Sequence, residues 1–190
     1  MPLPPPDAAR EPLHTRSIRV DSYARDDGLW DLEAELIDTK AYDFSRSDGS
    51  IQRAGDPVHH MRMRITIDDK YAIVAALVVY DAAPYDHHCT AIAPEYQGLV
   101  GMNLLRNFRQ AVKERFGRTA GCTHMSELSL VLPTAAVQSM SARRRAEQQR
   151  PHAKRPFSLD GCHALKIDGP VVKEYYPRWY TAVRGGARRE

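Results

Sequence analysis

The chain has 190 residues, of which 43% are hydrophobic, so it can bury a core and is not a globally disordered protein. Its formal net charge of +3 is too small to argue for nucleic acid as a partner, and no apolar run reaches the ~20 residues of a membrane-spanning helix. An odd, low number of cysteines, three in all, argues against a disulfide framework and leaves metal binding, catalysis or core packing open.

The first 13 residues are rich in proline and lack both the basic and the apolar region of a signal peptide. We therefore expect residues 1–13 to be a disordered stub and the protein to be cytoplasmic. After this stub, residues 15–23 alternate loosely between apolar and polar, and Asp27-Gly28 is typical of a hairpin turn. Residues 30–37 then alternate at period two, which predicts a half-buried strand.

Residues 41–58 have the composition of a loop, with glycines and a proline. The strand predicted next begins at Met61 and alternates apolar with polar side chains as far as Asp68. A short turn leads to residues 73–80, which are apolar on both faces. That pattern predicts a central strand covered by helices on one side.

The periodicity then changes to that of helices. Pro94 suits the first turn of a short helix, and residues 107–116 predict a better one, ended by Gly117. A third helix is expected to begin near Thr123 as its N-cap, with a kink or break at Pro133.

The last part of the chain is basic and then apolar. Residues 141–158 predict a mobile basic loop, for which a solvated linker is the favoured interpretation and a contact with nucleic acid or an acidic ligand the alternative. Residues 162–167 and 171–176 flank Asp168-Gly169-Pro170 and predict a terminal hairpin. We expect a single domain over residues 14–179 and a flexible tail over residues 180–190.

Cysteine and histidine residues fall at the ends of these predicted elements, where ligands from separate segments can meet at one point. They stand at the mouth of the strand at Met61, in the loop that holds His87 and His88, at the start of the third helix and at the start of the hairpin. The candidate metal ligands are His59, Cys89, Cys122, His124 and His163. A mixed set of nitrogen and sulfur donors suits zinc or iron.

Two acidic residues are candidates for a catalytic base that acts on metal-bound water. Glu127 shares a helix face with His124, and Asp68 follows the strand at Met61. Two alternatives stay open: a cysteine nucleophile with a histidine base, and cysteines that merely pack in the core. His14 and His152 fall in stretches predicted to be disordered and receive no role.

Several short stretches resemble a bacterial family of uncharacterised proteins over nearly the whole chain, from residue 14 to residue 179. The stretches are His14-Thr15-Arg16, Asp26-Asp27-Gly28-Leu29-Trp30-Asp31, Asp81-Ala82-Ala83-Pro84, Gly121-Cys122-Thr123-His124 and Asp160-Gly161-Cys162-His163-Ala164-Leu165. This resemblance implies a shared fold and no particular activity.

Residues 57–140 also resemble iron–sulfur cluster assembly scaffold proteins in the order of strands, helices and cysteines. The resemblance implies that Cys89 and Cys122 match the scaffold's second and third cysteines, and that its acidic residue falls near His59. The scaffold's first cysteine has no counterpart, since Pro57 or Val58 stands there.

Together these features predict an α+β fold, with a mostly antiparallel sheet of three to five strands and helices on one face. The leading functional hypothesis is a metal-dependent enzyme, such as a hydrolase, acting on a small molecule. The alternatives are a non-catalytic metal or iron–sulfur carrier and a metal-free binding protein. A homodimer stays open.

Overall fold

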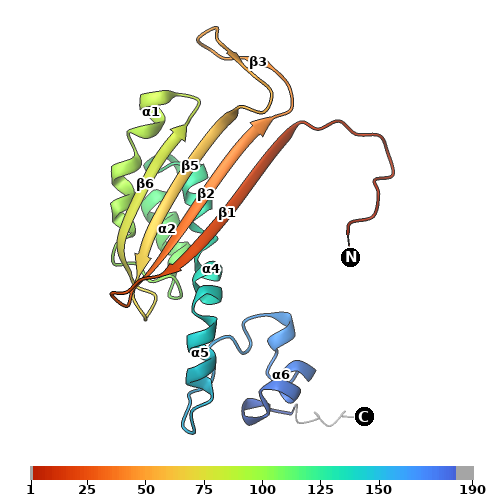
Figure 1. Cartoon of the computed structure of the whole chain (residues 1–190), viewed down its shortest axis with the longest axis vertical. Helices are drawn as coiled ribbons and strands as arrows, with labels where there is room; N and C mark the ends of the chain where they lie inside the picture. Colours follow the sequence, from red (N-terminus) through yellow and green to blue (C-terminus); the bar gives the residue numbers. More distant parts are fainter. Residues whose placement is uncertain (1, 183–190) are drawn as a thin grey trace, which may run out of the picture. The chain divides into compact units, whose positions relative to one another are not determined.

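The computed structural model describes residues 2–182 and has an α+β fold (Figure 1). The chain divides into two compact units, residues 1–139 and residues 140–190, which are described separately below. Residues 2–13 contain no helix or strand and are exposed. Among the residues described, no helix is both long and apolar enough to cross a bilayer.

The first unit is built on a four-stranded antiparallel sheet in the order β1-β2-β5-β6 (Figure 1). Its strands are β1 (His14–Ala24), β2 (Trp30–Lys40), β5 (Pro57–Ile67) and β6 (Ile73–Ala82). The predicted strands are confirmed, and so is the mostly antiparallel sheet. The segment predicted as a loop over residues 41–58 contains a small hairpin, β3 (Phe44–Ser45) and β4 (Ile51–Gln52), before β5 begins.

Period-two alternation gives the sheet one apolar face. Leu32 and Leu36 on β2 are fully buried, as are Met61 and Ile65, the residues opposite them on β5. The residues between them, such as Glu33 and its ion-pair partner on β5, face the other way. Hydrophobic burial of this one face is what requires the helices to pack there.

The helices of the first unit follow β6 and cover that face. They are α1 (Asp86–Thr90), α2 (Phe108–Phe116), α3 (Thr123–Ser129) and α4 (Leu132–Ser139), with 3₁₀ turns η1 (Ala93–Leu99) and η2 (Arg118–Ala120). Contacts of α3 with β2 and β5, and of α4 with β1 and β2, join the two layers. The stripe predicted for α2 is confirmed, since Phe108, Val112 and Phe116 are buried.

Details of three helix predictions change. The break predicted at Pro133 is confirmed, because α3 ends at Ser129 and α4 begins at Leu132. The N-cap of α3 is Cys122, not Thr123, and it makes no side-chain capping bond. His87, His88 and Cys89 lie in the short helix α1, not in a loop.

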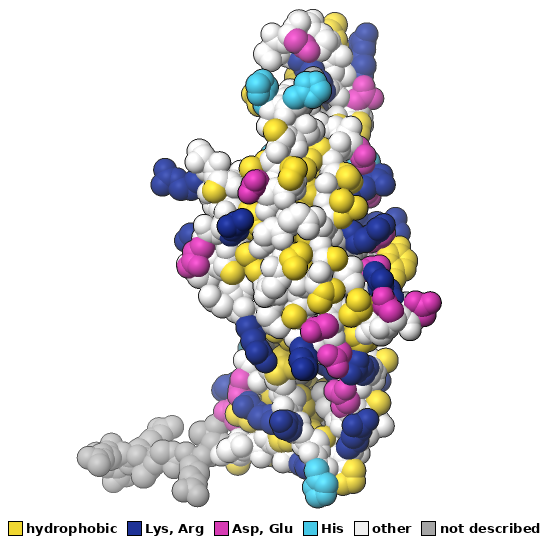
Figure 2. Space-filling view, turned by 90° about the vertical axis from the view of Figure 1, so that its left-hand side faces the viewer, with side chains coloured by type: hydrophobic (Ala, Val, Ile, Leu, Met, Phe, Trp, Pro, Cys, Tyr) yellow, Lys and Arg dark blue, Asp and Glu magenta, His cyan; other side chains and the backbone are white. Residues whose placement is uncertain are grey.

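The prediction that residues 73–80 form a central strand is wrong, because β6 lies at the edge of the sheet. After β6 the chain turns into α1 and η1, and the part of the chain that follows, as far as residue 182, adds no strand to the sheet. One of its apolar faces is therefore open to solvent, and Leu77 is 52% exposed there. Figure 2 shows hydrophobic side chains at the surface between interspersed positive and negative ones.

The second unit is helical over the residues described, and two predictions about it are wrong. Its elements are α5 (Ser141–Gln148), η3 (His163–Leu165), α6 (Pro170–Tyr175) and η4 (Pro177–Trp179). The basic segment predicted as a loop begins with α5, since alanine, arginine, glutamate and glutamine favour a helix. The predicted hairpin is instead η3 and α6, because Gly169 caps a helix that Pro170 begins. The tail predicted over residues 180–190 lies outside the described residues from residue 183 onward.

Candidate metal centre

The row of buried side chains on β2 ends in a charged residue, Asp38. Asp38 continues the series of Leu32 and Leu36 on the apolar face, and it is only 2% exposed. Register places Arg16 of β1 on one side of Asp38 and His59 of β5 on the other. The pairing of β2 with β5 is irregular directly after Asp38, and such bulges redirect side chains. A polar row thus adjoins the apolar rows of the sheet.

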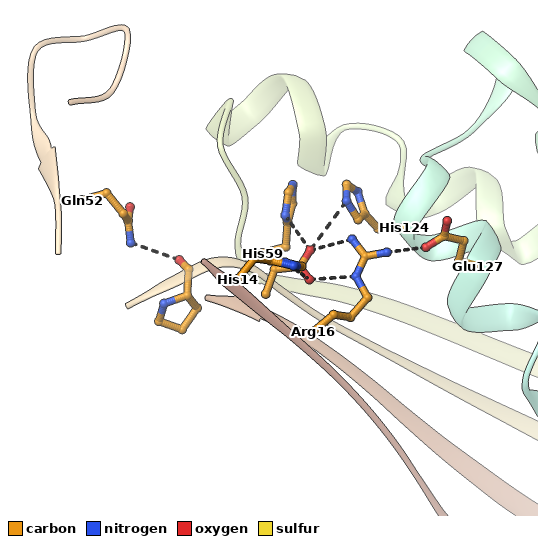
Figure 3. Close-up of polar contacts among 8 residues, drawn as sticks. His14, Arg16, Gln52, His59, His124 and Glu127 are labelled. Atoms are coloured by element: carbon orange, nitrogen blue, oxygen red, sulfur yellow. Dashed lines mark hydrogen bonds and ion pairs between the residues drawn. The ribbon is translucent and has the colours of Figure 1, made fainter. Parts of the chain in front are cut away.

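Arg16 binds both oxygens of the Asp38 carboxylate. Its Nε donates to Oδ1 at 2.7 Å and its Nη2 donates to Oδ2 at 2.8 Å, while Nε2 of His14 lies 3.0 Å from Oδ1 (Figure 3). Burial by itself raises the pKa of Asp38, but the hydrogen bond and charge of Arg16, together with the His14 contact, lower that pKa to about 2. Asp38 is therefore ionised at neutral pH despite its burial.

Two imidazoles approach the other side of the same carboxylate. Nδ1 of His59 lies 3.0 Å from Oδ2 of Asp38, and Nε2 of His124 lies 3.7 Å from it (Figure 3). The two rings are 3.9 Å apart between centroids and are tilted by 32°. His124 comes from α3, so the helix layer and two strands of the sheet contribute to one point.

The contact between His59 and Asp38 is close, but it lacks the alignment of a good hydrogen bond. Nδ1 of His59 is buried and has no hydrogen-bond partner among the described residues. A buried polar atom without a partner is costly and calls for an explanation. Asp38, His59 and His124 each offer one ligand atom, and these atoms lie within 4.8 Å of one another. A cation between them would satisfy the buried nitrogen.

Both imidazoles are held in their neutral form. Burial is the main cause that lowers the pKa of His59, followed by the charge of His124, and Asp38 offsets only part of this. Burial also lowers the pKa of His124, with the charge of Arg16 as the next cause. Neutral imidazole is the form that binds metal ions.

Glu127 joins this group through Arg16. Nη1 of Arg16 donates to Oε2 of Glu127 at 2.5 Å, so the guanidinium lies between the two carboxylates (Figure 3). Glu127 is exposed, whereas Asp38 is buried. One arginine therefore ties β1 to β2 and to α3.

The cysteines predicted as ligands lie elsewhere. Cys122 exchanges backbone hydrogen bonds with the hydroxyl of Tyr96, at 2.9 and 3.0 Å. Burial, followed by the charge of Cys122 and a hydrogen bond with it, raises the pKa of Tyr80. Neither cysteine belongs to the group around Asp38, so the candidate donor atoms there are nitrogen and oxygen instead of nitrogen and sulfur.

Of the two remaining predicted residues, Asp68 lies away from Asp38 within the first unit, and His163 belongs to the second unit. Asp68 follows the far end of β5, roughly 30 Å along the strand from His59. There its carboxylate accepts the N–H groups of Lys70 and Ala72, both at 2.8 Å, and shapes the turn to β6. His163 begins η3 in the second unit.

Sequence reasoning missed Asp38, Arg16 and His14. His14 was placed in a disordered stretch, whereas it begins β1 and pairs with Lys40. The sequence does contain a signal for Asp38. Asp38 stands two residues after Leu36, so the period-two alternation of β2 places it on the buried face. His59 likewise stands two residues before the buried Met61 on β5, so the alternation places it on the same face of the sheet.

Comparisons with known proteins identify the family. The chain belongs to the family described as "Protein of unknown function (DUF2889)", which matches residues 14–138. This confirms the resemblance to an uncharacterised family, while the later motif at Cys162 lies outside the matched residues. No curated protein and no solved structure matches the chain, and nothing found supports the likeness to iron–sulfur scaffolds.

Proposed function

We propose that the protein is a metal-dependent enzyme that acts on a small molecule, and that Asp38, His59 and His124 bind the metal ion. The observation that carries this proposal is the buried Nδ1 of His59, which lies 3.0 Å from a buried, ionised carboxylate without a well-aligned hydrogen bond to it. Two ligands of one metal ion lie in this way, since each directs its lone pair at the ion and not at the other ligand.

The donor set indicates which metal ions suit the site. Two imidazole nitrogens and one carboxylate oxygen occur in catalytic zinc sites, where water takes a further position. The same set of two histidines and one carboxylate also binds non-haem iron. We therefore keep zinc or iron as the proposed metal, now with nitrogen and oxygen donors.

The residues around the ligands fit a hydrolytic reaction. A bound zinc ion lowers the pKa of its water and so supplies a nucleophile at neutral pH. Arg16 holds both oxygens of Asp38 and His14 contacts Oδ1, while Oδ2 also faces the two imidazoles. Glu127 is the proposed general base, since its carboxylate is exposed and is fixed beside the group by Arg16.

A metal carrier is the second candidate, because the edge of the group is open to solvent. The side chains of His14 and Glu127 are 38% and 49% exposed. A partner protein could therefore reach the site and take up the metal. An iron–sulfur cargo is disfavoured, since clusters need thiolate ligands and the group has none among the residues described.

The first experiment measures metal binding. Purified protein is stripped with a chelator, reloaded with zinc or, without oxygen, with iron, and its metal content is determined. We expect one equivalent in the wild type and at least about tenfold weaker binding in His59→Ala and His124→Ala. His60→Ala is the matched control, because His60 is the next residue on β5 but binds Glu35 at 2.8 Å instead. Wild-type levels of metal in all three variants would rule the site out.

The second experiment separates the enzyme from the carrier. Metal-loaded protein is assayed with activated ester and phosphoester substrates in the presence of excess chelator. An enzyme keeps its metal and turns the substrate over, and Glu127→Gln lowers kcat while the metal content is unchanged. Rapid loss of metal to the chelator, with no turnover of the freshly loaded protein, supports the carrier instead.

A further inference from the structure

β1 is the outermost strand of the sheet, and its outer edge is open. It is 11 residues long, and its only strand partner among the described residues is β2 (Figure 1). An edge strand of this length offers a row of unpaired backbone N–H and C=O groups. Proteins protect such edges or use them to bind another strand.

The opposite edge of the same sheet is covered. The N–H of Ile73 donates to the carbonyl of Met102, and the N–H of Gly101 donates to the carbonyl of Ile73, each at 2.9 Å. Further along β6 the side-chain amide of Gln97 donates to the carbonyl of Ala76. Part of the edge at β6 is thus covered, whereas the edge at β1 has no strand partner among the residues described.

Two exposed charges on β1 select a partner for this edge. Arg19 and Asp21 lie on the face opposite to the helices, form an ion pair with each other at 2.9 Å, and have side chains that are 72% and 39% exposed. Next to a second β1 strand, each charge of this pair would also face a residue of the partner subunit. If two copies of β1 pair antiparallel, residues of the same face lie opposite one another. Centring the pair on Arg19 sets arginine against arginine, and centring it on Asp21 sets aspartate against aspartate. Only the register between these two, centred on Val20, sets each Arg19 against Asp21 of the partner subunit.

We infer that β1 pairs antiparallel with β1 of a second copy of this chain, with Val20 on the two-fold axis. The pairing joins two four-stranded sheets into one and forms two Arg19–Asp21 contacts between the subunits. It also extends the helix-covered face of the sheet across the axis, where Ile18, which is 41% exposed in one copy, lies opposite Ser22 of the partner subunit. Repulsion between like charges disfavours the registers centred on Arg19 or Asp21, and attraction between opposite charges favours this one.

The pairing has a consequence for the first unit but does not depend on the proposed metal site. Arg16 would lie opposite Ala24 of the partner subunit, so the β1–β2 turn of each copy lies beside His14 of the other. Substitutions at the metal ligands and substitutions on the outer face of β1 therefore test separate properties.

Charge reversal tests the inference. The full-length protein is studied by sedimentation equilibrium over micromolar to millimolar concentrations, and the wild type is expected to dimerise. Arg19→Asp and Asp21→Arg each replace both attractive contacts by repulsive ones, and we expect at least about tenfold weaker association. Arg53→Asp is the control, because it reverses one charge of an exposed ion pair away from β1, with Asp43 at 2.6 Å. Its association constant should equal that of the wild type.

Mixing the two reversed variants completes the test. Arg19→Asp carries two negative charges and Asp21→Arg two positive ones, so the mixture should form a heterodimer as stable as the wild-type dimer. This recovery also shows that each variant is folded. A monomeric wild type, a control that dissociates like the reversed variants, or a mixture that stays monomeric while the wild type dimerises would each overturn the inference.

Discussion

Asp38 is the residue on which the candidate site depends. A buried carboxylate remains charged only if neighbours replace the water it has lost, and Arg16 does so through two hydrogen bonds to the two oxygens. Because the arginine already balances the charge, the imidazoles are free to stay neutral. The site therefore combines a fixed negative charge with two neutral nitrogen donors.

The pKa of Asp38 predicts how stability depends on pH. A folded-state pKa of about 2, against an ordinary value of 3.8, corresponds to about 2 kcal/mol of stability. Since the folded pKa is the lower one, this contribution is present above pH ~4 and disappears as pH falls toward 2. Urea unfolding of chelator-treated wild type and Asp38→Asn, between pH 6 and pH 2, measures it.

The asparagine side chain of this variant cannot titrate, so the difference between the two proteins isolates the carboxylate. We expect the advantage of the wild type to shrink by about 2 kcal/mol from pH 5 to pH 2. A difference that is constant over this range would mean that Arg16 and His14 do not favour the ionised form of Asp38.

At the residue scale the sequence predicts part of the site. His59 and His124 could be chosen because each stands at the end of a predicted element, next to an apolar stripe. Asp38 could not be chosen in the same way, because an aspartate within a strand that also carries Asp31 and Glu33 is ordinarily a surface residue. Only its pairing with Arg16 across the strands makes its burial tolerable, and this register depends on contacts distant in the sequence.

At the scale of elements, the start of α3 determines where His124 lies. Gly121 precedes the N-cap of α3 and packs tightly against the end of α2. A Cβ at this position would lie 2.5 Å from the carbonyl oxygen of Phe116 and 2.8 Å from its Cβ. The backbone of Gly121 has φ −159°, which any residue adopts, so the constraint is space and not conformation.

Gly121→Ala is therefore expected to displace α3 from the sheet. We expect a loss of about 1–3 kcal/mol in the free energy of unfolding, as in other overpacked sites, and weaker metal binding through His124. Thr123→Ala is the control, because Thr123 is exposed and does not cap α3, and its effect should stay within about 0.5 kcal/mol. Calorimetry and metal titration of both variants check this; equal stability of the two would show that the turn can relax.

Strands were easier to predict than the ends of the chain. Alternation over β2 and β5 reports directly which face is buried, and both strands were found with their turns. The apolar run of β6 predicts a strand correctly but predicts a central position in the sheet, which is wrong. A strand that is apolar on both faces can also lie at the edge of a sheet with one face exposed. The terminal hairpin failed because Gly169-Pro170 suits the start of a helix as well as a turn.

For the whole molecule, the division into two units separates the candidate site from the basic segment. The three proposed ligands all lie between residues 38 and 124, within the unit that ends at residue 139. The match to the family ends at nearly the same place, at residue 138. The sheet, its helices and the metal group thus belong to one compact unit with its own buried core.

A chain truncated after Ser139 is expected to fold and to bind metal. The truncated chain retains all four strands of the sheet and the helices α1 to α4, whose apolar side chains form the core of the first unit. We expect cooperative unfolding in urea and a metal affinity within about threefold of the full chain, since no proposed ligand is removed. His59→Ala in the truncated chain is the control and should abolish the binding. If the truncated chain is folded but binds no metal, residues 140–190 supply something that the site needs, and His163 becomes the first residue to substitute in the full-length protein.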